Sequence, residues 1–133
     1  MRVLVVDDSQ ANRSIARVLL ENAGHRVMEA DGGEAAVSAA GEFLPDVILM
    51  DVAMPGMDGL EATRAIRRLE GDVGTTPVIA WTAHDIPGMR RQTSAAGMNA
   101  YLTKPVVRQT LIATIAAFGR SRGPNRIDAV QSA

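Results

Sequence analysis

Five short apolar runs, each followed by a stretch with helical spacing, constrain the fold of this chain more than any other feature. The runs occupy residues 3–6, 26–30, 46–51, 76–82 and 99–105. The first run contains β-branched residues and is too short for a helix, which is typical of a strand buried on both faces. Regular alternation of strand and helix predicts an α/β fold, in which helices cover both faces of a parallel sheet.

The expected helices carry recognisable boundary signals. Ser9 is expected to cap a first helix in which Ile15, Val18 and Leu19 recur at helical spacing and which ends at Gly24. The other helices are expected at residues 31–40, 60–69, 85–96 and 106–118.

Three further signals refine these boundaries. Asp31 with Glu34 and Asp58 with Glu61 each have the spacing of a capping box at a helix start. Pro105 suits the first turn of the last helix, because proline lacks the N–H that a first turn leaves unused.

Composition limits the class of protein. The 133 residues are 47% hydrophobic, enough for one domain with a core, and no cysteine is present to form disulfides or thiolate metal sites. A net charge of −1 argues against nucleic acid as a partner. Because no apolar run approaches a membrane span, we expect a cytoplasmic protein with no membrane partner. Residues 1–119 are expected to form the domain and residues 120–133 a flexible tail or linker.

Charged and hydroxyl side chains stand where the strands should end. Asp7 and Asp8 follow the first apolar run, Asp51 ends the third, Thr82 ends the fourth and Lys104 follows the fifth. Parallel strands bring their carboxyl ends to one edge of the sheet, so these side chains should converge. Two carboxylates 4 Å apart repel by about 1 kcal/mol in water and about 4 kcal/mol near a protein surface. An all-oxygen donor set without histidine or cysteine therefore favours Mg²⁺ at this edge.

At these residues the chain resembles the receiver domain of two-component response regulators. The matching stretches, in the family's order and spacing, are "VLVVDDS", "DVILMDVAMPGMDGLEATRAIR", "PVIAWTA" and "AYLTKP", and the resemblance covers residues 2 to about 118. It implies a flavodoxin-like (βα)5 fold with strand order 2-1-3-4-5. The stretches "DDSQANR" and "MDVAMPGMDG" are most similar to receivers of hybrid histidine kinases and to free-standing relay receivers.

The resemblance implies a role for each residue at the sheet edge. Asp51 would accept a phosphoryl group from the phosphohistidine of a histidine kinase or histidine phosphotransfer protein. Asp8, Asp51 and the backbone carbonyl of Ala53 would bind Mg²⁺, and Asp7 would act through a metal-bound water. Lys104 would pair first with Asp51 and then with the phosphoryl oxygens.

The resemblance also implies a conformational switch. Thr82 Oγ and the amide of Ala83 would bind a phosphoryl oxygen, and Tyr101 would move from exposed to buried as Thr82 moves inward. The Lys104–Pro105 bond is expected to be cis. The chain would thus be a switch with self-phosphorylation and slow self-hydrolysis, not a conventional enzyme, and its downstream partner protein is not specified by the sequence.

Several positions depart from the family pattern. Ala53 and His84 occupy the positions that tune the lifetime of the phosphoryl group, and we expect a lifetime longer than that of a fast chemotaxis-type switch. The stretch "HDIPGMRRQ" places proline and glycine where the fourth helix should begin, so that helix is expected to start late or to be mobile. Trp81, the sole tryptophan, is expected to pack in the core.

Two alternative functions remain open at this point. A haloacid-dehalogenase-type phosphohydrolase also forms an aspartyl phosphate with Mg²⁺, but it needs an acid two residues after its nucleophile, where this chain has Ala53. A receiver that docks without phosphorylation usually lacks the acceptor, an acid or the lysine, and all are present here. Nucleotide binding is not supported, because no G-x-G-x-x-G follows the first strand.

Overall fold

Five strands form at the apolar runs, and their order determines where a ligand can bind. The computed structural model describes residues 1–119. Its strands are β1 (Arg2–Val6), β2 (Arg26–Ala30), β3 (Val47–Asp51), β4 (Val78–Thr82) and β5 (Ala100–Thr103). All pair in parallel in the order β2-β1-β3-β4-β5, which confirms the flavodoxin-like order expected from the sequence. Strand addition reverses direction between β1 and β3, and folds of this kind bind ligands in the crevice at that point.

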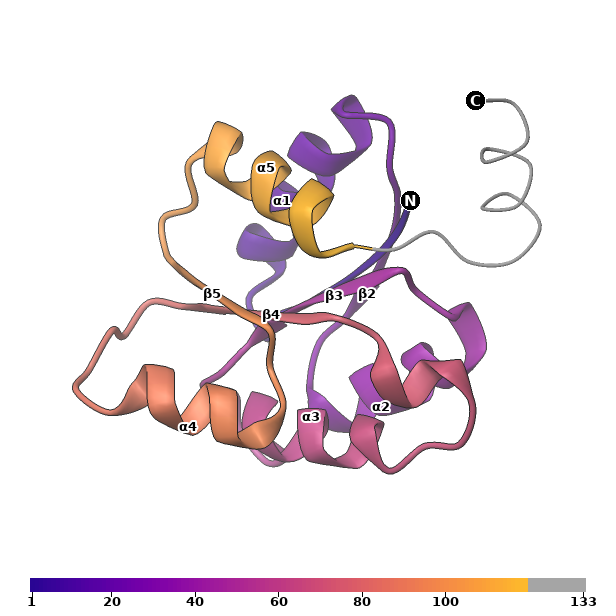
Figure 1. Cartoon of the computed structure of the whole chain (residues 1–133). Coiled ribbons are helices and arrows are strands. Elements are labelled where there is room, and N and C mark those ends of the chain that lie inside the picture. The colour runs from indigo at the N-terminus through magenta and orange to yellow at the C-terminus, as the bar shows by residue number, and fades with distance from the viewer. Residues whose placement is uncertain (120–133) are drawn as a thin grey trace.

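Helices cover both faces of the sheet, as the strand–helix alternation predicted. One face carries α1 (Gln10–Asn22) and α5 (Arg108–Phe118), and the other carries α2 (Gly33–Phe43), α3 (Gly59–Arg67) and α4 (Met89–Ala96) (Figure 1). A short 3-10 helix, η1 (Asp72–Thr75), lies between α3 and β4 and was not predicted. Within residues 1–119, no helix has the length and apolar character needed to cross a membrane.

The central strands are buried on both sides. Every residue of β3 and β4 is buried, and so is all of β1 except Arg2. Because side chains alternate along a strand, Leu4 and Ile48 pack in the core under α2 and α3, whereas Val3 and Leu49 pack in the core under α1 and α5. The two cores fix the sheet firmly, so the strand ends can hold functional side chains in defined positions.

Most helix boundaries agree with the sequence signals. The Ser9 side chain caps α1, and Asp58 and Glu61 form a complete capping box at α3. The fourth helix starts late, as predicted: α4 begins at Met89, directly after Gly88 in the left-handed conformation (φ +85°).

The predicted capping box at the second helix was wrong. Gly32, not Asp31, occupies the N-cap position of α2, and no side chain caps it. The later start places Glu34 only two residues after the cap, where it does not have the capping-box spacing. Its charge instead lies in the first turn, near the positive end of the helix dipole.

The predicted place of Pro105 was also wrong. The backbone is still extended at Val107 (φ −78°, ψ 132°), so α5 begins only at Arg108 and Pro105 lies in the preceding loop. The Lys104–Pro105 bond is cis, as expected. The predicted tail at residues 120–133 lies outside the described residues.

The apolar residues whose spacing predicted α1 do not all form its buried face. Ala16 and Leu20 are the buried residues of α1. Ile15 is 59% exposed and Val18 is 55% exposed. This helix therefore presents two large apolar side chains to solvent, on the same side of the sheet as α5.

Gly59 allows α3 to begin directly beneath the end of β3. A Cβ at this position would lie 2.1 Å from the backbone oxygen of Asp51. Gly59→Ala is therefore expected to lower the free energy of unfolding by about 2 kcal/mol, as overpacking against backbone does. The matched control is Gly41→Ala inside α2, where the space is open and alanine should raise stability by about 0.5–1 kcal/mol. Urea denaturation of the two variants should show changes of opposite sign, and equal changes would contradict the close-approach argument.

Candidate functional site

Three carboxylates meet at the carboxyl ends of β1 and β3. Asp51 is the last residue of β3, and Asp7 and Asp8 directly follow β1. One carboxylate oxygen of each acid lies within 4.8 Å of those of the other two. Asp7 and Asp51 are buried, whereas Asp8 is exposed to solvent. The structure thus brings together the three acids that the strand-end argument placed at this edge.

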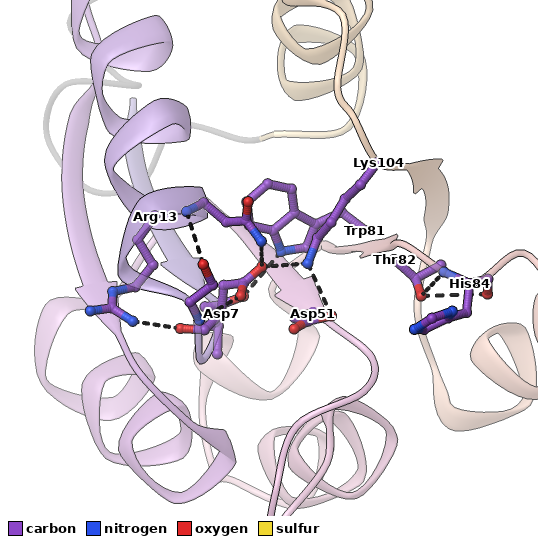
Figure 2. Close-up of polar contacts among 10 residues, drawn as sticks. Asp7, Arg13, Asp51, Trp81, Thr82, His84 and Lys104 are labelled. Atoms are coloured by element: carbon purple, nitrogen blue, oxygen red, sulfur yellow. Dashed lines mark hydrogen bonds and ion pairs between the residues drawn. The ribbon is translucent and has the colours of Figure 1, made fainter.

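The Asp7 carboxylate is held by the beginning of α1. The backbone N–H of Ser9 donates to its Oδ1 at 2.8 Å, and the side-chain amide of Asn12 donates to its Oδ2 at 3.4 Å. Arg13 donates to the Asp7 backbone carbonyl oxygen at 2.8 Å (Figure 2). The Nε of Arg13 also pairs with Glu29 of β2 at 2.9 Å. These bonds fix Asp7 in one orientation, independently of any ligand.

Lys104 supplies the positive charge of the site. Its Nζ lies 2.5 Å from Asp7 Oδ2 and 3.4 Å from Asp51 Oδ1, so one ammonium bridges acids from two strands (Figure 2). The backbone N–H of Lys104 donates to the carbonyl oxygen of Thr82 at 2.8 Å, which joins the chain after β5 to the end of β4. The contacts between the Lys104 ammonium and the two carboxylates are charge-assisted, and such bonds are stronger than bonds between neutral groups.

The environment of Asp51 works against its ionisation. Burial, and next the neighbouring charge of Asp7, raise the pKa of the Asp51 carboxyl from 3.8 to about 6. Lys104 and a backbone hydrogen bond from Ala53 oppose this rise in pKa. The single ammonium therefore does not compensate the negative charge, and Asp51 is still mainly ionised at neutral pH.

The donor set at this edge fits a hard divalent cation. Three carboxylates face one ammonium, which leaves an excess of negative charge, and every candidate ligand is an oxygen atom. Mg²⁺ takes one or two protein carboxylates and retains several waters, which suits two buried acids beside an exposed one. The residues present therefore fit the cation that the sequence predicted.

The side-chain hydroxyl of Thr82 is not bonded to the acids or to the ammonium of this cluster. Thr82 is buried, and its Oγ accepts a hydrogen bond from the backbone N–H of His84 at 3.1 Å (Figure 2). Within residues 1–119, the Thr82 hydroxyl makes no hydrogen bond to Asp51 or Lys104. Ala83 and His84 are exposed at the start of the loop that leads to α4. The Thr82 hydroxyl, which was expected to take part in the site, is thus hydrogen-bonded to the backbone of His84 instead.

Tyr101 lies on the edge strand β5 and contacts residues around the start of α4. Its hydroxyl donates to Asp85 Oδ1 at 3.0 Å, and the guanidinium of Arg90 lies 4.2 Å from the centre of its ring. Burial, and next the hydrogen bond to Asp85, raise the pKa of the Tyr101 phenol. Tyr101 is partly exposed in this arrangement.

One contact of the site was not predicted from the sequence. Trp81 is buried in the core, as predicted, but its ring also lies under the ammonium of Lys104, with 4.7 Å between Nζ and the ring centre. The signal was available in part, because Trp81 stands one residue before the end of β4, next to the strand that leads to Lys104. Spacing alone does not show which way the long lysine side chain turns.

Comparisons with known proteins give consistent results. The family described as the response regulator receiver domain matches residues 3–116. Among curated relatives, the sensor protein GacS of Pseudomonas syringae pv. syringae is 45% identical over 112 residues, which are 83% of this chain and 12% of GacS. Protein PilH of Pseudomonas aeruginosa is 39% identical over 116 residues, which are 87% of this chain and 95% of PilH. The chain thus spans a small part of the first relative and nearly the whole of the second.

A solved structure supports the same comparison. The receiver domain of the sensor histidine kinase PA1611 from Pseudomonas aeruginosa superposes with a TM-score of 0.81 and 37% identity, covering 88% of this chain and 95% of that domain. That structure has a magnesium ion coordinated in its active-site cleft.

The raised pKa of Asp51 predicts a pH-dependent stability in the metal-free protein. Between pH 3.8 and about 6 the folded protein retains a proton that the unfolded chain has released, so its free energy of unfolding should fall as the pH rises. Asp51→Asn removes this titration and should be more stable than the parent at pH 7 by on the order of 1 kcal/mol, allowing for solvent screening. Urea denaturation in EDTA from pH 4 to pH 7 measures the difference. Parallel curves for the two proteins would contradict the prediction.

Proposed function

The chain belongs to the family of response regulator receiver domains, and from this premise we propose that it accepts a phosphoryl group on Asp51 in a Mg²⁺-dependent reaction. The observation that carries the proposal is the position of Asp51, buried between Asp7 and Lys104 at the crevice where strand addition reverses. Phosphoryl transfer needs little covalent help from the protein beyond positioning and charge neutralisation, and this edge offers both.

Asp51 is suited to be the nucleophile. With a pKa of about 6 it is mainly ionised at pH 7, yet it is basic enough to attack phosphorus. One carboxylate oxygen forms a bond to phosphorus as the P–N bond of a phosphohistidine breaks. The bonding electron pair stays on the imidazole nitrogen, which is then protonated from solvent. The product is an acyl phosphate on Asp51, and Lys104 Nζ, 3.4 Å from the attacking group, is near enough to pair with the new negative charge.

The residues that would hold Mg²⁺ are Asp8, Asp51 and the backbone carbonyl of Ala53, with Asp7 acting through a water. When bound, the cation supplies positive charge against the phosphoryl oxygens and the carboxylates. Asp7 is already fixed by Ser9 and Lys104, so it can orient a water without rearranging.

We also propose a histidine kinase or a histidine phosphotransfer protein as the donor. Several curated relatives are named sensor histidine kinases, such as GacS of Pseudomonas protegens, and this chain spans only 14% of that protein. The exposed side chains of Ile15 and Val18 on α1 support docking of a partner helix. Ile15 also lines a pocket together with Lys104 and Pro105, so an apolar contact there would lie next to the phosphoryl-accepting group.

The proposed switch passes through Thr82 and Tyr101. A phosphoryl oxygen on Asp51 would compete with the backbone carbonyl oxygen of His84, 3.5 Å from Thr82 Oγ, as acceptor of the Thr82 hydroxyl, and would also use the amide of Ala83. Movement of Thr82 toward Asp51 would displace the loop that carries Asp85. In the present structure, the Tyr101 hydroxyl donates to Asp85 Oδ1 at 3.0 Å. Tyr101 would then be free to turn toward the space that Thr82 leaves.

Labelling with a small phosphodonor and Mg²⁺, followed by mass mapping, tests the proposal. The parent should gain one phosphoryl group on Asp51, and Asp51→Asn should gain none, whereas the exposed control Glu42→Gln should behave as the parent. Lys104→Ala should still be labelled. In this variant, however, phosphorylation should bury Tyr101 less than in the parent, as measured by hydrogen exchange with solvent. An unlabelled parent would favour a docking module, and rapid multiple turnover of the donor would favour a phosphohydrolase.

The lifetime of the label is part of the same proposal. Ala53 cannot position an attacking water, because its side chain is a methyl group. A phosphoryl group that decays within seconds after removal of the donor would contradict the slow decay that we expect.

Removal of one carboxylate should weaken cation binding. Asp8→Asn is expected to lower the affinity for Mg²⁺ by about tenfold or more, because it removes the exposed charged ligand while leaving the core untouched. The rise in melting temperature with Mg²⁺ concentration measures this affinity without any phosphodonor. Glu42→Gln is again the control, and a parent whose melting temperature does not respond to Mg²⁺ would argue against the site.

A further inference from the structure

The ring of Trp81 forms a surface against which the Lys104 ammonium rests. The distance from Nζ to the ring centre is 4.7 Å, within the range of cation–π contacts, and the same Nζ is bonded to Asp7. Figure 2 shows the indole beside the lysine side chain. The ammonium is thus in contact with two carboxylates and one aromatic face.

The indole itself is held in a fixed orientation. Its Nε1–H donates to the backbone carbonyl oxygen of Val6 at 3.0 Å, across from β4 to β1. Trp81 is only 3% exposed and belongs to the core cluster under α1 and α5, which also contains Ala16 and Leu111. A buried ring with its only polar atom bonded cannot easily turn away from the lysine.

Lys104 needs such a restraint more than the acids do. Lysine carries its charge on a flexible four-carbon stem and loses about 1.5–2 kcal/mol of side-chain entropy when it is ordered. Asp7 is held by Ser9 and Asn12, but the ammonium has no other hydrogen-bond partner than the carboxylates among the described residues. Because the side chain of Lys104 is only 15% exposed, water weakens the cation–π attraction less than it would at an open surface.

We propose that Trp81 is a positioning residue for Lys104, holding the ammonium between Asp7 and Asp51 before the phosphoryl group arrives. This role rests on the proposed function, since it concerns the lysine that meets the phosphoryl oxygens. Trp81 takes no part in bond making; it acts by fixing where the positive charge stands. If the residue served packing alone, its replacement would change stability but not the behaviour of Lys104.

A double-mutant cycle on the full chain separates these two roles. Trp81→Leu should slow phosphorylation by a small phosphodonor by about fivefold to tenfold, and Trp81→Phe, which keeps an aromatic face, should slow it less. In the Lys104→Ala background, Trp81→Leu should change the rate by no more than about twofold. Ile115→Ala is the control: it opens the same core cluster from α5 and should lower the melting temperature without changing the rate.

A readout without phosphorylation keeps the inference separate from the proposed function. In the parent, NMR signals of the Lys104 methylene protons next to Nζ should be shifted upfield by the indole ring, and Trp81→Leu should return them to ordinary values. Ordinary values in the folded parent, or equal rate losses from Trp81→Leu with and without Lys104, would overturn the inference. A shifted lysine in a chain that cannot be phosphorylated would overturn the proposed function and leave the contact itself established.

Discussion

The structure depends on one constraint: the central strands of a parallel sheet end in acids that a single ammonium does not neutralise. Asp7 and Asp51 lie at adjacent strand ends because β1 and β3 pair in register, with Val6 opposite Met50. Lys104 reaches both carboxylates, but burial and the charge of Asp7 still raise the pKa of Asp51 to about 6. The edge therefore carries residual negative charge in a fixed place, and that charge fits the cation and the phosphoryl group that we propose to bind there.

The rest of the fold holds this edge in shape. Arg13 connects the Asp7 carbonyl to Glu29, so α1 and β2 support the acid from one side. Gly59 lets α3 start against the backbone of Asp51 on the other side. Two cores, one on each face, keep β1 and β3 from shifting relative to one another. The unfavourable grouping of charge is stable because packing far from the charges determines the register.

The sequence predicted which residues reach this edge better than it predicted what they contact. Strand ends follow from apolar runs, and parallel pairing puts Asp7, Asp51 and Lys104 together whatever their rotamers. The hydroxyl of Thr82 and the ring of Trp81 differ, because their partners are the backbone of His84 and an ammonium from another strand. Those contacts depend on loop path and side-chain direction, which a one-dimensional pattern does not contain.

The helix boundaries that were predicted wrongly also depend on tertiary contacts, which a local sequence pattern does not contain. A capping box is a local pattern, and it succeeds at Asp58, where the first turn of α3 is free to use it. At Asp31 the chain enters α2 one residue later, with Gly33 packed against Met57, where a Cβ would lie 2.4 Å from the Met57 oxygen. Tertiary packing therefore decided the start of α2 over the local preference.

Lys104 links the charged edge to the surface where Tyr101 lies. Its ammonium meets Asp7 and Asp51, while its backbone N–H holds the carbonyl of Thr82. Tyr101 stands three residues earlier, on β5, and its hydroxyl is bonded to Asp85 in the loop that follows Thr82. In the proposed switch, a new negative charge at Asp51 would draw on the lysine and the threonine together, and both belong to segments that contact the tyrosine. A few bonds around the ends of β4 and β5 would then be enough to connect the charge at the edge with the position of Tyr101.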